Sequence, residues 1–155
     1  MSEHDPVTAE RLFELHFWPL YPDDTKKDLA RARALDANPA SNVNILRSLD
    51  EIADTFVGMA KSTFGGPDLG LDGSDASVHR LSAALDRERR DRWTRERAPD
   101  GAPVLTHVVI HGAIYVASCV VRNHGATWQV RRPLWESQVR LVSPIEKADL
   151  AIFHW

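Results

Sequence analysis

The feature that most constrains the fold is a long, mainly apolar run over residues 104–122. Its many β-branched residues favour strands, but its length is typical of a helix of about five turns. Pro103 suits the first turn of a helix, and the Asn-His-Gly sequence at 123–125 suits its end. Because the run is apolar on every face, we predict a buried central helix in which Gly112 allows close packing. Two strands broken near Gly112 are the alternative.

The same run is the one stretch long enough to cross a membrane. Thr106, His107, His111 and Ser118 lie within it, and polar groups are costly in a bilayer, so we interpret it as a core element. The acidic N-terminus lacks the basic region of a secretory signal, and a single cysteine, Cys119, forms no internal disulfide. We therefore expect a cytoplasmic protein without membrane association.

Apolar residues at helical spacing, preceded by capping residues such as Asp5, Ser41 and Ser74, predict further helices. They cover residues 6–17, 24–35, 41–64 and 74–97. A short edge strand is expected over residues 68–72, between two glycine-rich turns.

The C-terminal part alternates between apolar and polar residues over 127–132 and again over 138–142. This pattern predicts an antiparallel pair of strands joined through residues 133–137. The sequence Ser-Pro-Ile-Glu at 143–146 matches a capping box and predicts a last helix that is still apolar at Phe153. The sequence then either stops inside that helix, as a truncated chain would, or packs its last residues on the core.

These patterns together predict an α+β fold, with four or five helices packed on a small antiparallel β-sheet near the C-terminus. The length of 155 residues is typical of one domain, so we expect a single domain over residues 1–155. Residues 1–40 are expected to form a helical N-terminal extension that packs on it.

Three short sequences carry a resemblance to other proteins. They are Leu-Asp-Gly-Ser at 71–74, Gly-Ala-Ile-Tyr at 112–115 and Gly-Ala-Thr-Trp at 125–128. In this order, over about residues 68–145, they resemble small bacterial α+β proteins of uncharacterised function, although Ala117 stands where such proteins carry glycine. The resemblance implies a helix at 104–122 and assigns no catalytic residue.

His107 and His111 form the best candidate for metal chemistry, because a spacing of four residues places both imidazoles on one face of a helix. Val108 stands where a zinc protease carries its glutamate base, and no third ligand is evident. We therefore expect hydrogen-bonded histidines and no metal or cofactor. A metal-dependent hydrolase using this pair is the alternative function.

Residues 87–97 contain six arginines interleaved with three acids, and the whole chain has a net charge of −3. Such alternation is typical of a solvated helix face, and no aromatic platform for nucleic acid accompanies it. A nucleic-acid-associated factor is therefore only a second alternative. We expect Arg92 and Arg95 to belong to a surface that binds another protein.

The sequence Arg-Pro-Leu-Trp at 132–135 lies between the two predicted strands, where proline prevents the ladder from continuing. Tryptophan and arginine dominate the energetics of protein interfaces. We therefore predict that Arg132, Leu134 and Trp135 form a partner-binding surface. The leading hypothesis is a non-catalytic protein-binding module, such as an adaptor, an immunity factor or an accessory subunit.

Overall fold

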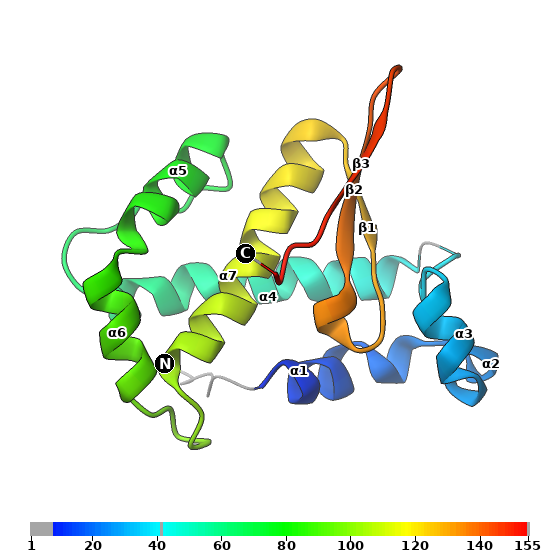
Figure 1. The fold of residues 1–155 in the computed structure, drawn as a ribbon, viewed down its shortest axis with the longest axis horizontal. Coiled ribbons are helices and arrows are strands. Elements are labelled where there is room, and N and C mark those ends of the chain that lie inside the picture. The colour runs from blue at the N-terminus through cyan, green and yellow to red at the C-terminus, as the bar shows by residue number, and fades with distance from the viewer. Residues whose placement is uncertain (1–7, 41, 155) are drawn as a thin grey trace.

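The computed structural model describes residues 8–40 and 42–154, in which the chain forms seven α-helices and a three-stranded antiparallel sheet (Figure 1). The predicted α+β class is confirmed, while the helices outnumber the four or five expected. The elements are α1 Ala9–His16, α2 Asp23–Lys27, α3 Leu29–Ala34, α4 Val43–Thr63, α5 Asp75–Ala84, α6 Arg87–Arg95, α7 Val104–His124, β1 Thr127–Gln129, β2 Gln138–Val142 and β3 Lys147–Leu150, with 3-10 turns at Trp18–Leu20 and Leu134–Glu136.

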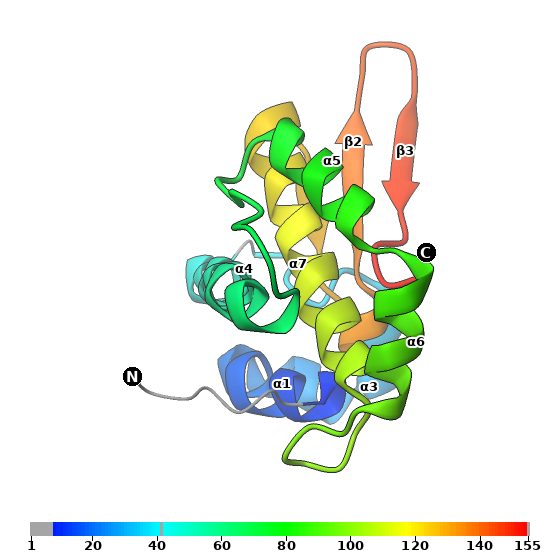
Figure 2. The same cartoon turned by 90° about the vertical axis from the view of Figure 1, so that its left-hand side faces the viewer.

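The apolar run folds as the single helix α7, so the predicted central helix is confirmed and the two-strand alternative is wrong. Gly125 ends the helix with φ +63°, in the left-handed region that favours glycine. α4 packs on one side of α7, and α5 and α6 pack on the other (Figures 1 and 2). By length and composition α7 could cross a membrane, but 61% of its most apolar window is buried within the protein.

α7 packs closely against α4 at Gly112, as predicted. A Cβ atom built on Gly112 would lie 3.3 Å from the Phe56 ring of α4, and both residues are buried. The Phe56 ring also contacts Phe64 and Tyr115, with centroid distances of 6.5 and 5.7 Å. The missing side chain at 112 thus leaves the space that this aromatic packing fills.

Two helices that we predicted as continuous are each divided by an aspartate. The predicted 24–35 helix becomes α2 and α3 at Asp28, whose carboxylate accepts a hydrogen bond from the backbone N–H three residues on (2.9 Å). The predicted 74–97 helix becomes α5 and α6 at Asp86, which accepts the equivalent bond (2.8 Å). An aspartate satisfies the free N–H groups at a helix start, so a new helix can begin at each position.

The predicted starts of the first and third helices, at Asp5 and Ser41, lie outside the described residues. Within the described chain, Thr8 and Asn42 stand before α1 and α4, and their side-chain oxygens accept hydrogen bonds from the first turns (3.2 and 3.0 Å). Both helices therefore begin at a polar capping side chain.

The sheet has the order β1, β2, β3, and β2 and β3 project beyond the helices as a hairpin (Figures 1 and 2). The predicted antiparallel pair is confirmed, with Trp128 of β1 opposite Val139 of β2. β1 ends at Gln129 and is shorter than the predicted 127–132 strand. Residues 68–72 form a loop, so the predicted edge strand is wrong.

The predicted helix from Ser143 is also wrong, because residues 143–146 form a tight turn that leads into β3. Ser143 Oγ accepts a hydrogen bond from Glu146 N (3.1 Å), the bond a helix cap makes, but Ser143 N donates back to Glu146 O (2.9 Å). Serine followed by proline is equally favoured at the start of a β-turn. Arg140 and Asp149, which lie opposite each other on β2 and β3, then form an ion pair (2.7 Å).

The N-terminal helices share the core of the rest of the protein. Leu12, Phe13 and Phe17 are buried in one cluster with residues of α4 and α7 and with Leu134 from the β1–β2 connection. This packing brings α1 against that connection, where the candidate site lies.

Candidate functional site

A groove of about 400 Å³ lies where α1 and α3 meet the connection between β1 and β2. We call it the Trp135 groove. It includes two of the residues predicted to bind a partner, and it adds residues from the N-terminal helices. Its lining consists of Glu10, Phe13, Leu29, Ala30, Arg33, Arg132, Pro133 and Trp135.

Arg132 is half-buried in this groove and is held by aromatic rings. Its guanidinium carbon lies 4.1 Å from the centre of the Trp18 ring and 4.9 Å from that of Phe13. Such cation–π contacts stabilise a guanidinium without using its N–H groups. In the described part of the chain, no carboxylate pairs with Arg132, although most other arginines near the helices have one.

Trp135 and Leu134 lie on opposite sides of the 3-10 turn that joins β1 to β2. Trp135 is 42% exposed, whereas Leu134 is fully buried in the main core cluster. The expectation that Leu134 faces a partner is therefore corrected. A short helical turn points adjacent side chains in different directions, so one residue anchors the turn while the next remains at the surface.

Hydrogen bonds tie this turn to α3. Arg131 donates to the Arg33 carbonyl (2.8 Å), and Arg33 Nε donates to the Arg132 carbonyl (3.3 Å). Ser137 Oγ accepts a hydrogen bond from Arg131 N (2.9 Å) and closes the connection on itself. The backbone on both sides of the Trp135 groove is thus held in place by polar contacts.

A cluster of aromatic side chains packs against the Phe13 and Trp18 rings that hold Arg132. Phe13 stacks on Phe17 and Tyr21, with centroid distances of 5.7 and 5.6 Å, and lies 6.5 Å from Trp18. Burial raises the pKa of the Tyr21 hydroxyl above its ordinary value. Nothing in the local sequence of residues 18–22 indicates that Arg132 stacks on Trp18.

Arg92 and Arg95, the other predicted partner-binding residues, lie on α6, away from the β1–β2 connection (Figure 1). Arg92 pairs with Glu96 (3.6 Å), and Arg95 Nε donates to the carbonyl of Asp91 (3.0 Å). The structure therefore does not bring these arginines into the Trp135 groove. Trp93, between them, is buried against Phe64.

The histidine pair lies in the buried part of α7. His107 Nε2 is 3.2 Å from Asp100 Oδ1, and His111 Nδ1 donates to the carbonyl oxygen of His107 (2.9 Å). Burial lowers the pKa of His111, which favours its neutral form. Among the residues that the structure describes, no group of three or more His, Cys, Asp or Glu could hold a metal ion.

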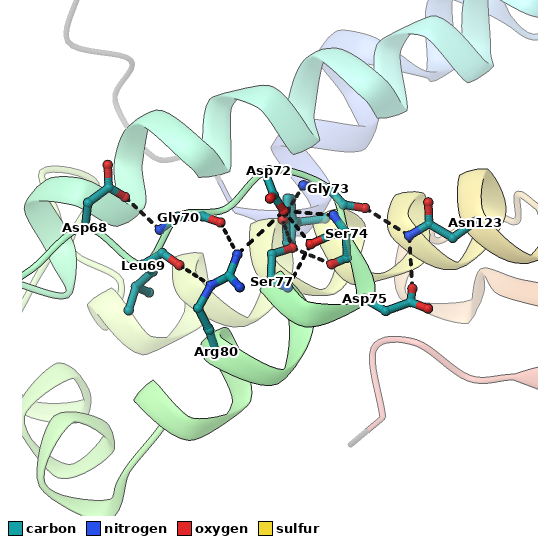
Figure 3. Close-up of polar contacts among 11 residues, drawn as sticks. Asp68, Leu69, Gly70, Asp72, Gly73, Ser74, Asp75, Ser77, Arg80 and Asn123 are labelled. Carbon is teal, nitrogen blue, oxygen red and sulfur yellow. Dashed lines mark hydrogen bonds and ion pairs between the residues drawn. The ribbon is translucent and has the colours of Figure 1, made fainter.

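A second polar region forms where the loop 68–75 packs on α5 and α7 (Figure 3). Asp68 and Asp72 accept hydrogen bonds from backbone N–H groups of the loop itself (2.9 and 3.0 Å). Arg80 of α5 and Asn123 of α7 donate to loop carbonyl oxygens (2.7 and 3.0 Å). The polar groups of this loop are therefore largely used to fold it.

Ser74 caps α5, as predicted, because its Oγ accepts a hydrogen bond from Ser77 N (3.2 Å). The same hydroxyl donates to Asp72, and this bond lowers the pKa of the Asp72 carboxyl. Tyr115 of α7 accepts a hydrogen bond from Gly73 N (3.0 Å) and lies 2.6 Å from Ser77 Oγ. Asp72 and Ser74 therefore form a turn and a helix cap at the start of α5.

Cys119 is buried on α7 near this loop. Burial raises the pKa of its thiol, so the thiolate needed for nucleophilic chemistry is disfavoured. The residue therefore acts as a small apolar side chain in the core.

The chain matches no known protein-family model, no curated protein and no solved structure. We therefore infer its function from the geometry of the Trp135 groove.

Proposed function

We propose that this chain is a non-catalytic protein-binding module, of the adaptor, immunity-factor or accessory-subunit kind, that binds its partner through the Trp135 groove. The observation that carries the proposal is the half-exposed indole of Trp135 in the same groove as the stacked guanidinium of Arg132, which pairs with no carboxylate of the described residues. Tryptophan and arginine are the residue types that most often dominate binding energy at protein interfaces.

The groove is also arranged before a partner arrives. Leu134 is buried beneath the turn, and Arg132 is stacked on Trp18, so neither element needs to be ordered on binding. Fixing mobile side chains at an interface costs about 0.5–1.5 kcal/mol each, so a preformed surface binds more tightly. This preorganisation supports a binding role for the groove.

The two alternative functions have less support. A hydrolase would need a third metal ligand beside His107 and His111, and no such group occurs in the described chain. A nucleic-acid-binding role for α6 would need free positive charge, and Arg89, Arg90 and Arg92 already pair with nearby acids, which leaves Arg87, Arg95 and Arg97 without an ion pair among the described residues.

The test is selection of a phage-displayed random peptide library on the immobilised wild-type protein, with calorimetry of the selected peptides. We expect Trp135→Ala to weaken their binding by at least about 2 kcal/mol, or about thirtyfold in Kd. Its thermal midpoint should hardly change, because the indole is half exposed. Ile145→Ala is the matched control, since Ile145 is 93% exposed at the hairpin tip and should leave binding intact.

Three outcomes would refute the proposal. The library could yield no binder, or its peptides could bind Trp135→Ala as tightly as they bind the wild type. Unfolding of Trp135→Ala would place the indole in the core and remove the surface on which the proposal depends.

A further inference from the structure

The charged side chains that line the Trp135 groove differ in whether they have an ion-pair partner. Arg33 pairs with Glu136 (3.4 Å), but both side chains are about half exposed, and such pairs are weak. Glu10 lines the α1 side of the groove, and no ion pair joins it to Arg132 in the described chain. Neither Glu10 nor Arg132 has an ion pair among the described residues, but Glu10 is exposed to solvent while Arg132 is half-buried, so the greater need for a partner charge belongs to the Arg132 guanidinium.

The way Arg132 is held decides which chemistry can meet that demand. The guanidinium carbon lies over the Trp18 and Phe13 rings, and cation–π contacts of this kind do not use the N–H edges of the group. Those edges form a planar fork that matches the two oxygens of a carboxylate. A stacked arginine with no internal acid is thus suited to an incoming carboxylate.

Apart from Glu10, Arg33 and Arg132, the side chains that line the groove are apolar. Trp135 and Leu29 are 42% and 44% exposed, and Ala30 and Pro133 lie beside them. A volume of about 400 Å³ lies within the range of pockets that enclose compact ligands, which is about 300–1,000 Å³. The groove can therefore hold an apolar side chain together with a neighbouring acid.

Resting on the proposed function, we infer that the partner presents an acidic segment to the Trp135 groove. One carboxylate of that segment binds Arg132, and an adjacent apolar side chain packs on Trp135 and Leu29. Charge complementarity identifies this partner chemistry, because no carboxylate within residues 8–40 and 42–154 pairs with Arg132, while the apolar wall is exposed next to it.

The test uses three synthetic peptides that share one central leucine and differ only in its flanking residues, which are Glu, Gln or Lys. Binding is measured by fluorescence anisotropy on the full chain. We expect the Glu peptide to bind at least about tenfold more tightly than the Gln peptide, and the Lys peptide to bind most weakly. Rising salt concentration should reduce the Glu preference.

Three variants locate the effect. Arg132→Lys keeps the charge but loses the planar fork, so most of the Glu preference should disappear. Glu10→Gln leaves the stacked arginine untouched and removes a repelling charge, so the Glu peptide should bind about two- to fivefold more tightly. Arg31→Gln is the matched control, because Arg31 is exposed on α3 but does not line the groove.

The outcomes separate the two proposals. Trp135-dependent binding with equal affinity for the Glu and Gln peptides, or with the order reversed, overturns the acidic partner and leaves the binding module intact. If none of the three peptides binds, the library-selected peptides decide, and a lack of Asp and Glu among them overturns the inference. A library without any Trp135-dependent binder refutes the proposed function itself.

Discussion

Replacing Gly112 by alanine tests the packing of α4 against α7 directly. Alanine is favoured over glycine within a helix by about 1 kcal/mol, so propensity alone predicts a gain in stability. The added Cβ would lie 3.3 Å from the buried Phe56 ring, which is closer than ordinary van der Waals contact. Overfilling a packed core costs about 1–3 kcal/mol, so we expect Gly112→Ala to lower the unfolding free energy by about 0–2 kcal/mol.

Gly58→Ala supplies the control, because Gly58 is an exposed position within α4 and its added Cβ meets nothing within 4 Å. This variant should gain about 0.5–1 kcal/mol, so urea unfolding should separate the two alanine variants by about 0.5–3 kcal/mol. In a Phe56→Leu background the cost of Gly112→Ala should shrink. Stabilisation by Gly112→Ala equal to that of Gly58→Ala would refute the close approach of the two helices.

Three further predictions concern the core and its histidines. Leu49→Ala, Phe56→Ala and Leu81→Ala should each cost about 2–5 kcal/mol in urea unfolding, since all three are buried, and losses below about 1 kcal/mol would contradict the helix phases. Burial lowers the pKa of His111, so its contribution to stability is complete above about pH 6.5 and is lost as the pH falls through its folded-state pKa. His111→Gln should therefore flatten the pH dependence of the unfolding free energy below about pH 6.5. An unchanged slope would show that His111 does not cause this pH dependence. Chelation by EDTA should leave the thermal midpoint unchanged, whereas stoichiometric zinc that is lost in His107→Ala would favour the hydrolase alternative.

Sequence patterns predicted an element correctly where no other secondary structure could bury the same residues equally well. α7 could be predicted because a long run that is apolar on every face, with a glycine at its end, has few other ways to be buried. These patterns did not predict the element correctly where a helix start and a β-turn use the same serine hydrogen bond. Ser143 accepts the bond expected of a helix cap but starts a turn, and the cross-strand pair of Arg140 with Asp149 favours the strand. That pair is a contact between two strands, so it is not evident from either segment alone.

The candidate site was only partly predictable for the same reason. A proline next to Arg132 and Trp135 indicated an interruption between strands, and the structure places both residues in one groove. The opposite wall comes from α1 and α3, about a hundred residues earlier in the chain, and no spacing in the sequence reports that contact. The burial of Leu134 likewise depends on the tertiary core and not on its own segment.

The construction of the groove links partner binding to the order of the N-terminal helices. α2 and α3 contain five and six residues, and helices this short are not stable in isolation. α3 is held by contacts that include the hydrogen bonds of Arg33 and Arg131 across the groove. A ligand that binds only when both walls are present adds its binding free energy to the stability of that arrangement. On the proposed function, a partner in the Trp135 groove would therefore stabilise the packing of α3 on the β1–β2 connection when it binds.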